Sequence, residues 1–106
     1  MEIKTKLVDG VLTVALLGEL DHHGAVAARR DIDKLIEDSA PSKVVLRLDG
    51  IYFCDSSGLG LIMGRYKKAL SVGAVLTVDE PSAAVDRMIK LAGLNQLIKT
   101  ERSGAL

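Results

Sequence analysis

Hydrophobic residues near the start of the chain fall in two short aliphatic runs, at residues 3–8 and 11–17. Asp9-Gly10 separates the two runs. An Asp-Gly pair between β-type segments favours a tight turn, because a type I′ turn requires positive φ at both central residues. We therefore predict that the chain begins with an antiparallel β-hairpin.

Further along, the apolar residues recur every three or four positions, which is the period of a helix. This spacing predicts helices over residues 25–36 and 56–70. Pro81-Ser82 predicts the start of a third helix, with Ser82 as its N-cap and an inner face that carries Val85, Met88 and Ala92. Gly93 is expected to end this third helix in the left-handed conformation.

Uniformly aliphatic segments separate these helices and predict strands. Residues 44–48 form one such segment, whose most regular part is expected to end at Asp49-Gly50, and residues 75–78 form another. A short last strand is expected at residues 97–98, followed by a frayed tail over residues 101–106. A hairpin followed by alternating helices and strands predicts an α/β fold, with a mixed β-sheet flanked by helices in a single domain over residues 1–106.

Composition narrows the class of protein. The chain has 106 residues, of which 48% are hydrophobic and only 3% aromatic, so one aliphatic core is expected. The formal net charge is +0, which argues against direct binding to nucleic acid. No apolar run approaches the roughly 20 residues of a membrane span, and the N-terminus lacks the apolar region of a signal peptide. A single cysteine excludes an internal disulfide. We therefore expect a cytoplasmic domain without a membrane partner.

The most unusual segment is Cys54-Asp55-Ser56-Ser57-Gly58-Leu59-Gly60, at the start of the second predicted helix. A dinucleotide-binding loop does not fit, because Gly64 comes one position too late for G-x-G-x-x-G. A cysteine phosphatase would need an arginine six positions after Cys54, where Gly60 stands. A phosphate receiver centred on Asp55 would need an acidic pair after an N-terminal strand, and none is present. Two interpretations of the segment stay open. Either one of its serines accepts a phosphate, or the serines and Asp55 only cap the helix.

Two further features have both a functional and a structural interpretation. Asp21-His22-His23 contains metal-binding residue types, but adjacent histidines point in different directions, so capping by Asp21 is favoured and no metal is expected. In the second helix, one apolar stripe is predicted to face the core: Leu59, Ile62, Met63, Tyr66 and Leu70. The neighbouring face carries Ser57, Gly60, Leu61, Gly64 and Lys68.

The glycines of that second face require an explanation. Glycine within a helix costs roughly 0.8–1 kcal/mol relative to alanine. Close approach of a partner protein at Gly60 and Gly64 would explain them, and so would tight packing within the domain. The residues alone leave both explanations open.

Three segments together resemble the anti-sigma factor antagonists, also called anti-anti-sigma factors, of the STAS domain family. They are Gly18-Glu19-Leu20-Asp21-His22-His23, Asp55-Ser56-Ser57-Gly58-Leu59-Gly60 and Gly64-Arg65-Tyr66-Lys67. The Asp-His-His element is similar to the sporulation, or SpoIIAA, type within that family. The resemblance covers nearly the whole chain, up to Ala92-Gly93-Leu94, and the chain departs from it at Asn95-Gln96.

The resemblance implies regulation by partner switching in sporulation. The unphosphorylated protein would bind an anti-sigma factor that is also an ATP-dependent serine kinase, and thereby release a sigma factor. The kinase would inactivate the protein by phosphorylating Ser56, and a serine phosphatase would restore it. No catalytic residue and no cofactor is then expected. We expect the following residues to bind the partner: Asp21, Asp55, Ser56, Ser57, Gly58, Gly60, Leu61 and Gly64. The alternative is a STAS module that senses a nucleotide or lipid-like ligand without phosphorylation.

Overall fold

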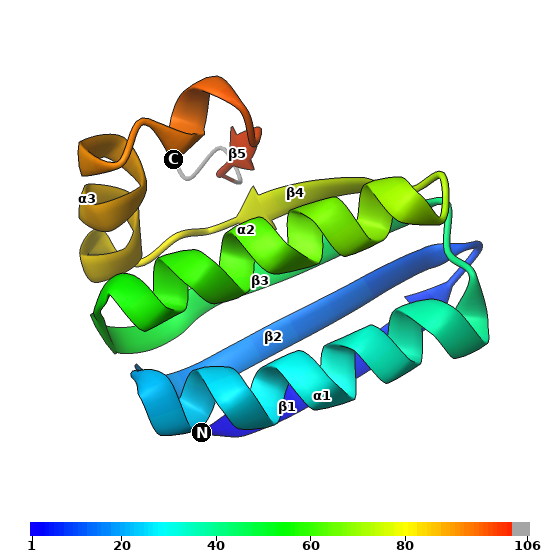
Figure 1. Cartoon of the computed structure of the whole chain (residues 1–106), viewed down its shortest axis with the longest axis horizontal. Coiled ribbons are helices and arrows are strands. Elements are labelled where there is room, and N and C mark those ends of the chain that lie inside the picture. Colours follow the sequence, from blue (N-terminus) through cyan, green and yellow to red (C-terminus); the bar gives the residue numbers. More distant parts are fainter. Residues whose placement is uncertain (103–106) are drawn as a thin grey trace.

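Residues 1–102, the part of the chain that this computed structural model describes, form a five-stranded sheet with helices packed against it (Figure 1). In chain order the elements are β1 (Glu2–Val8), β2 (Val11–Leu20), α1 (His22–Ser39), β3 (Lys43–Cys54), α2 (Ser56–Ser71), β4 (Val75–Asp79), α3 (Ala83–Leu91), the 3₁₀ helix η1 (Leu94–Gln96) and β5 (Thr100–Glu101).

The first two strands form the predicted hairpin. β1 pairs antiparallel with β2, and Val8 lies opposite Val11 across the turn. Asp9 and Gly10 both have positive φ, 51° and 77°. The Asp-Gly pair therefore makes the turn that the sequence predicts.

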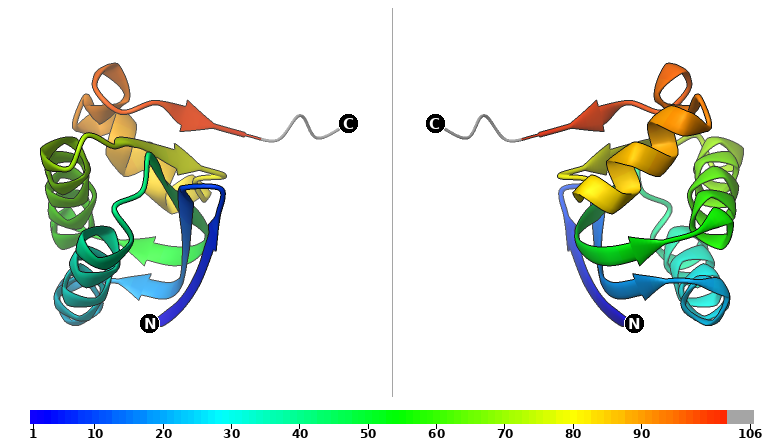
Figure 2. Two further views of the ribbon diagram at one scale, coloured as in Figure 1. Left: turned by 90° about the vertical axis from the view of Figure 1, so that its right-hand side faces the viewer. Right: turned by 90° about the vertical axis from the view of Figure 1, so that its left-hand side faces the viewer.

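The other strands are parallel, in the order β2-β3-β4-β5, so the sheet is mixed, as expected. α1 and α2 lie side by side over one face of the sheet (Figures 1 and 2). α3 packs against β3 and against η1. Each parallel crossover brings the start of a helix to the edge where a strand ends, and this arrangement positions the candidate site.

The core lies between the sheet and its helices and is aliphatic. Side chains along β3 alternate between the core and solvent: Leu46 and Leu48 are buried, whereas Arg47 and Asp49 are exposed. The corresponding face of β2 contributes Leu12, Val14 and Leu16. Within residues 1–102 no helix is both long and apolar enough to cross a membrane.

The regular part of β3 ends near Asp49-Gly50, as predicted, where its pairing with β2 shifts register. The strand continues to Cys54, because β2 also continues and pairs with it beyond a register shift between Ala15 and Leu17. A Cβ on Gly50 would lie 2.9 Å from the Cγ of Leu17. Gly50 thus permits close contact between the strands and does not mark a turn.

The predicted last strand at residues 97–98 is also wrong. The amides of Leu97 and Ile98 both donate to the carbonyl of Leu94, so these residues close the turn of η1. The final strand is β5, in which Thr100 lies opposite Val78 of β4. It overlaps the start of the tail expected over residues 101–106, and residues 103–106 lie outside the described part of the chain.

The third helix begins as predicted, with the Ser82 side chain accepting a hydrogen bond from the amide of Val85. Its inner face is only partly as expected. Val85 is buried, but the second buried residue is Ile89, while Ala92 is exposed because the helix ends before it. Gly93 takes the left-handed conformation, with φ of 73°.

Candidate functional site

The N-termini of α1 and α2 lie beside each other at the edge of the sheet where the parallel strands have their carboxyl ends. Leu20 and Cys54 are partners in the parallel β2–β3 ladder, and each is followed by an aspartate that caps a helix. Asp21 Oδ1 accepts a hydrogen bond of 2.9 Å from the amide of Gly24, and Asp55 Oδ1 accepts one of 2.8 Å from the amide of Ser57. Neighbouring parallel strands end at the same edge, so the topology brings together two motifs more than thirty residues apart.

Both serines of the second motif belong to α2 itself. Asp55 is the N-cap, Ser56 is the first helical residue, and Ser57 is the second. Ser56 is exposed, whereas Ser57 is half-buried and faces α1. Capping is thus the role of Asp55, and the hydroxyl of Ser56 is accessible at the positive end of the helix dipole.

Gly58 lies in the interior and not on the partner-facing surface expected from the sequence. A Cβ at this position would lie 2.5 Å from the Sγ of Cys54 and 3.0 Å from the Cγ of Leu20. The glycine therefore allows the first turn of α2 to pack directly on the ends of β2 and β3. This contact helps to hold Ser56 at the edge of the sheet.

α2 is rotated relative to the orientation that its apolar stripe predicts. Ile62 is fully buried as expected, but Leu70 is 53% exposed. The buried residues are Gly58, Leu61, Ile62, Arg65 and Ala69. Apolar residues occupy more than one face of this helix, so the periodicity does not determine which face meets the sheet.

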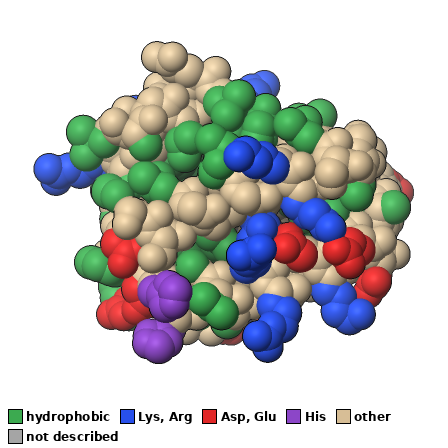
Figure 3. Space-filling view, in the orientation of Figure 1, with side chains coloured by type: hydrophobic (Ala, Val, Ile, Leu, Met, Phe, Trp, Pro, Cys, Tyr) green, Lys and Arg blue, Asp and Glu red, His purple; other side chains and the backbone are tan. Residues whose placement is uncertain are grey.

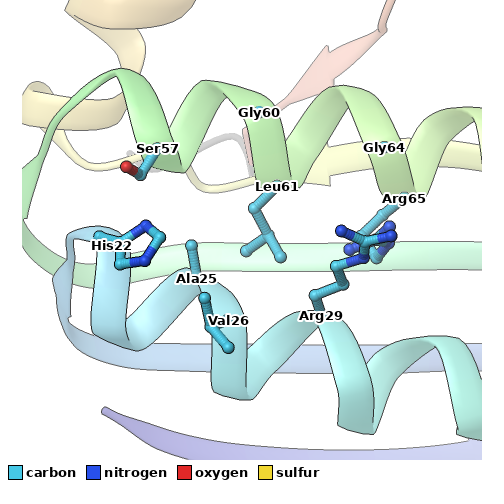
Figure 4. A pocket seen from close by; sticks show the side chains of 9 residues that line it. All are labelled: His22, Ala25, Val26, Arg29, Ser57, Gly60, Leu61, Gly64 and Arg65. Carbon is cyan, nitrogen blue, oxygen red and sulfur yellow. The ribbon is translucent and has the colours of Figure 1, made fainter.

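The face that carries Gly60 and Gly64 borders an open groove of about 420 Å³ between α1 and α2 (Figure 4). From α1 the groove is lined by His22, Ala25, Val26 and Arg29, and from α2 by Ser57, Gly60, Leu61, Gly64 and Arg65. A Cβ on Gly60 or on Gly64 would meet nothing within 4 Å. Tight packing within the domain therefore does not explain these two glycines.

One end of the groove is charged. Arg65 is only 5% exposed, and its Nε lies 2.8 Å from Asp33 Oδ1. Arg29 approaches the other oxygen of Asp33, at 4.0 Å. Burial lowers the pKa of Arg65 and Arg29 lowers it further, whereas the charge of Asp33 opposes the change. Basic and acidic side chains gather along the line between the two helices (Figure 3).

In the sequence, Arg65 belongs to the segment Gly64-Arg65-Tyr66-Lys67, which contributes to the family resemblance. Nothing in the pattern of one helix indicates that this arginine is buried, because its burial depends on Asp33 of α1. The pairing of α1 with α2 continues at Lys68 and Glu37, whose Nζ and Oε1 lie 2.5 Å apart.

Cys54 is the last residue of β3, and the two histidines lie in the first turn of α1. Cys54 is half-buried, and burial, followed by the charge of Asp55, raises the pKa of its thiol. A raised pKa keeps sulfur protonated and disfavours nucleophilic attack. The rings of His22 and His23 pack edge to face with their centroids 6.1 Å apart. Within residues 1–102, no group of three or more metal-binding side chains converges.

Comparison with known proteins gives a consistent match. A family model described as the STAS domain matches residues 2–105. An anti-sigma F factor antagonist from Paenibacillus polymyxa is 37% identical over 98 residues, which are 92% of this chain and 84% of the relative. The unphosphorylated form of the anti-sigma factor antagonist SpoIIAA has 27% identity and a TM-score of 0.80, with 93% of this chain and 87% of that chain covered. The phosphorylated form of the Bacillus cell fate determinant SpoIIAA has 26% identity and a TM-score of 0.73, covering 93% and 90%.

Proposed function

Because this chain belongs to the STAS domain family, we propose that it is an anti-sigma factor antagonist that works by partner switching. In its unphosphorylated form it binds an anti-sigma factor that is also a serine kinase, and the sigma factor is released. The kinase then uses ATP to phosphorylate Ser56, which ends the binding, and a serine phosphatase reverses the change. The chain itself acts as ligand and substrate and catalyses no reaction.

The observation that carries this proposal is the position of the Ser56 hydroxyl. It is exposed, it begins α2, and it lies at the edge where Asp21 and Asp55 cap neighbouring helices. A kinase can reach an exposed hydroxyl without unfolding the helix. Ser57, by contrast, is half-buried and faces the groove. Exposure thus favours Ser56 over Ser57 as the acceptor, a choice that the residues alone left open.

The same position explains how a phosphate could release a partner and leave the fold intact. A phosphoserine carries about −1.5 to −2 charges, and the N-terminus of a helix stabilises negative charge. In the complex, the phosphate would lie next to Asp55. The partner's surface, which fits the small neutral hydroxyl of Ser56, would then face a dianion. Because about 1.4 kcal/mol corresponds to a tenfold change in affinity, a penalty of a few kcal/mol would release the partner.

The names of the relatives support a biological setting for this proposal. The similarity to an anti-sigma F factor antagonist supports a role in the control of sporulation transcription. Because the proposed kinase uses ATP, we propose that the exchange takes place in the cytoplasm. Asp21, Asp55 and Ser57 share the edge with Ser56, so we propose that they contact the anti-sigma factor together with Gly60, Gly64 and Leu61 in the adjoining groove.

The proposal is tested by incubating the full chain with the anti-sigma factor serine kinase of the same organism and ATP. Intact mass and peptide mapping should find one phosphate, on Ser56. Ser57→Ala should still be phosphorylated, and Ser56→Ala should not, although it should still bind the kinase. If the wild-type chain takes up no phosphate from a kinase that is active on another substrate, the proposal is wrong, and a ligand-sensing STAS module becomes the better interpretation.

A second variant separates capping from partner binding at Asp21. Asparagine is also a good N-cap, so Asp21→Asn keeps the hydrogen bond to the Gly24 amide and removes the charge. We expect unchanged stability in urea and weaker binding to the anti-sigma factor. Equal affinity for the wild-type chain and Asp21→Asn would remove Asp21 from the proposed interface.

A further inference from the structure

The charges at the end of the α1–α2 groove do not balance. Arg29 and Arg65 both approach the carboxylate of Asp33, so two cations share one anion. The Nη1 atom of Arg65 is buried and, within the described part of the chain, has no hydrogen-bond partner. The close-up view shows the Arg29 and Arg65 side chains beside each other at this end of the groove (Figure 4). An unpartnered guanidinium nitrogen next to a second cation is complementary to one more negatively charged group.

The rest of the groove is complementary to apolar groups. Val26 on its margin is 48% exposed, Ala25 is half-buried, and Leu61, which also belongs to the core, reaches the groove with only 4% of its surface exposed. Gly60 and Gly64 have no Cβ, so the backbone of α2 is open to close approach. A free inorganic anion would occupy only the arginine end and leave this apolar length uncovered.

The groove also continues to the proposed phosphorylation site. Ser57 lines one end and Arg65 the other, and their separation of eight positions corresponds to about 12 Å of helix. A chain segment lying in the groove would therefore reach from the arginines to the neighbour of Ser56.

From these observations we propose that the groove receives a segment of the anti-sigma factor that carries an acidic side chain. The carboxylate binds Arg65 and Arg29, and adjacent apolar side chains of the segment cover Leu61, Gly60 and Gly64. This inference rests on the proposed function, because it takes the anti-sigma factor as the partner. It adds a charged contact at Arg65 and Arg29, and Arg65 lies about two and a half helical turns from Ser56, so phosphorylation does not alter this contact directly.

The test compares two neighbouring arginines of α1. Arg29 lines the groove, whereas Arg30 is exposed and is not part of the lining. Arg29→Glu and Arg30→Glu make the same change in net charge in the same helix, and circular dichroism checks that both are folded. Titration calorimetry with the purified anti-sigma factor serine kinase should show a loss of affinity of about tenfold or more for Arg29→Glu, and less than about twofold for Arg30→Glu. The difference should shrink at high salt, because screening weakens ion pairs.

A second variant tests the apolar part without changing any charge. The methyl group of Gly64→Ala would meet no atom of this chain within 4 Å. It would, however, occupy space in the proposed binding groove. The affinity of this variant should fall by about fivefold or more even though the helix is not weakened, because a well-packed interface tolerates extra volume poorly. Equal affinities for the wild-type chain, Arg29→Glu and Gly64→Ala would overturn the groove proposal.

The outcomes also separate this inference from the proposed function. If Ser56→Asp loses binding while Arg29→Glu and Gly64→Ala bind like the wild-type chain, only the groove proposal fails. A wild-type chain that binds no kinase overturns both. In NMR spectra of the labelled chain, the Arg65 side-chain Nε–H signal should shift with the kinase. A comparable shift with ATP or inorganic phosphate alone would instead assign the groove to a free anion, and the proposal of a protein segment would be wrong.

Discussion

Gly58 of α2 lies directly against Cys54 at the end of β3. A Cβ on Gly58 would lie 2.5 Å from the Cys54 Sγ, closer than two such atoms can approach. Because Gly58 has no side chain, the Cys54 thiol fits against it. This contact sets the distance between the first turn of α2 and the sheet. Because Ser56 is two residues earlier in the same turn, this contact also determines where the proposed acceptor stands.

The effect of a methyl group should differ sharply between two glycines of α2. Gly58→Ala should destabilise the fold by about 1–3 kcal/mol, because Cys54 and Leu20 leave no space for it. Gly60→Ala is the matched control: its Cβ meets nothing within 4 Å, and alanine should stabilise the helix by up to about 1 kcal/mol. Urea denaturation of both variants measures the two changes.

A double variant tests whether Cys54 is the cause. Cys54→Ala removes the Sγ, so the cost of Gly58→Ala should be smaller in its presence, with a remaining penalty from Leu20, whose Cγ would lie 3.0 Å from the new methyl group. If the costs of the two substitutions simply add, the direct contact does not explain the effect.

Removing the charge of Asp33 should leave the buried Arg65 cation without its counter-ion. We expect Asp33→Asn to lower the free energy of unfolding by about 1–3 kcal/mol, a value limited by the partial exposure of Asp33 itself. Asp31→Asn makes the same charge change at an exposed site of α1 and should stay within about 0.5 kcal/mol of the wild-type chain. Urea unfolding of the two variants provides the comparison, and equal stabilities would show that Arg65 does not depend on Asp33.

Ser56→Asp should remain folded while losing its partner. A carboxylate in the first turn of a helix is favourable by roughly 0.3–1 kcal/mol, and repulsion from Asp55 opposes this gain, so the melting temperature should change little. Affinity for the anti-sigma factor serine kinase should fall strongly. A circular dichroism melt that finds Ser56→Asp unfolded at room temperature would contradict the explanation in which the interface alone is disrupted.

Stability at acidic pH should depend on Asp86 of α3. Its carboxylate lies 2.9 Å from Lys90 and 3.2 Å from Arg102, and the hydrogen bond from Lys90 is the main cause that lowers its pKa. A lowered folded-state pKa means that the stabilisation is present above the unfolded pKa of about 4 and is lost as the pH falls through the folded value.

Asp86→Asn should therefore be less stable than the wild-type chain at pH 7, by under about 1 kcal/mol because the pair is close to solvent, and the difference should vanish at strongly acidic pH. Asp38→Asn removes the more exposed pair with Lys34 and should have a smaller effect. Thermal unfolding at both pH values measures this. A difference that grows toward acidic pH would reverse the sign expected here.

The features that follow from local sequence agree with the structure. The Asp9-Gly10 turn, the caps at Asp21 and Ser82, and the alternation of helices and strands each depend on residues a few positions apart. Turn geometry, capping and periodicity act over that range, so the chain itself determines the α/β class and the motifs at the two helix N-termini.

Tertiary structure decided what depends on contacts between distant segments. The rotation of α2, the burial of Arg65 against Asp33 and the packing of Gly58 on Cys54 all involve more than one element. The length of β3 depends on its pairing with β2, and β5 forms at residues 100–101 because β4 offers a free edge there. Such contacts are set by how whole faces fit together, and the spacing of apolar residues along one element does not contain that information.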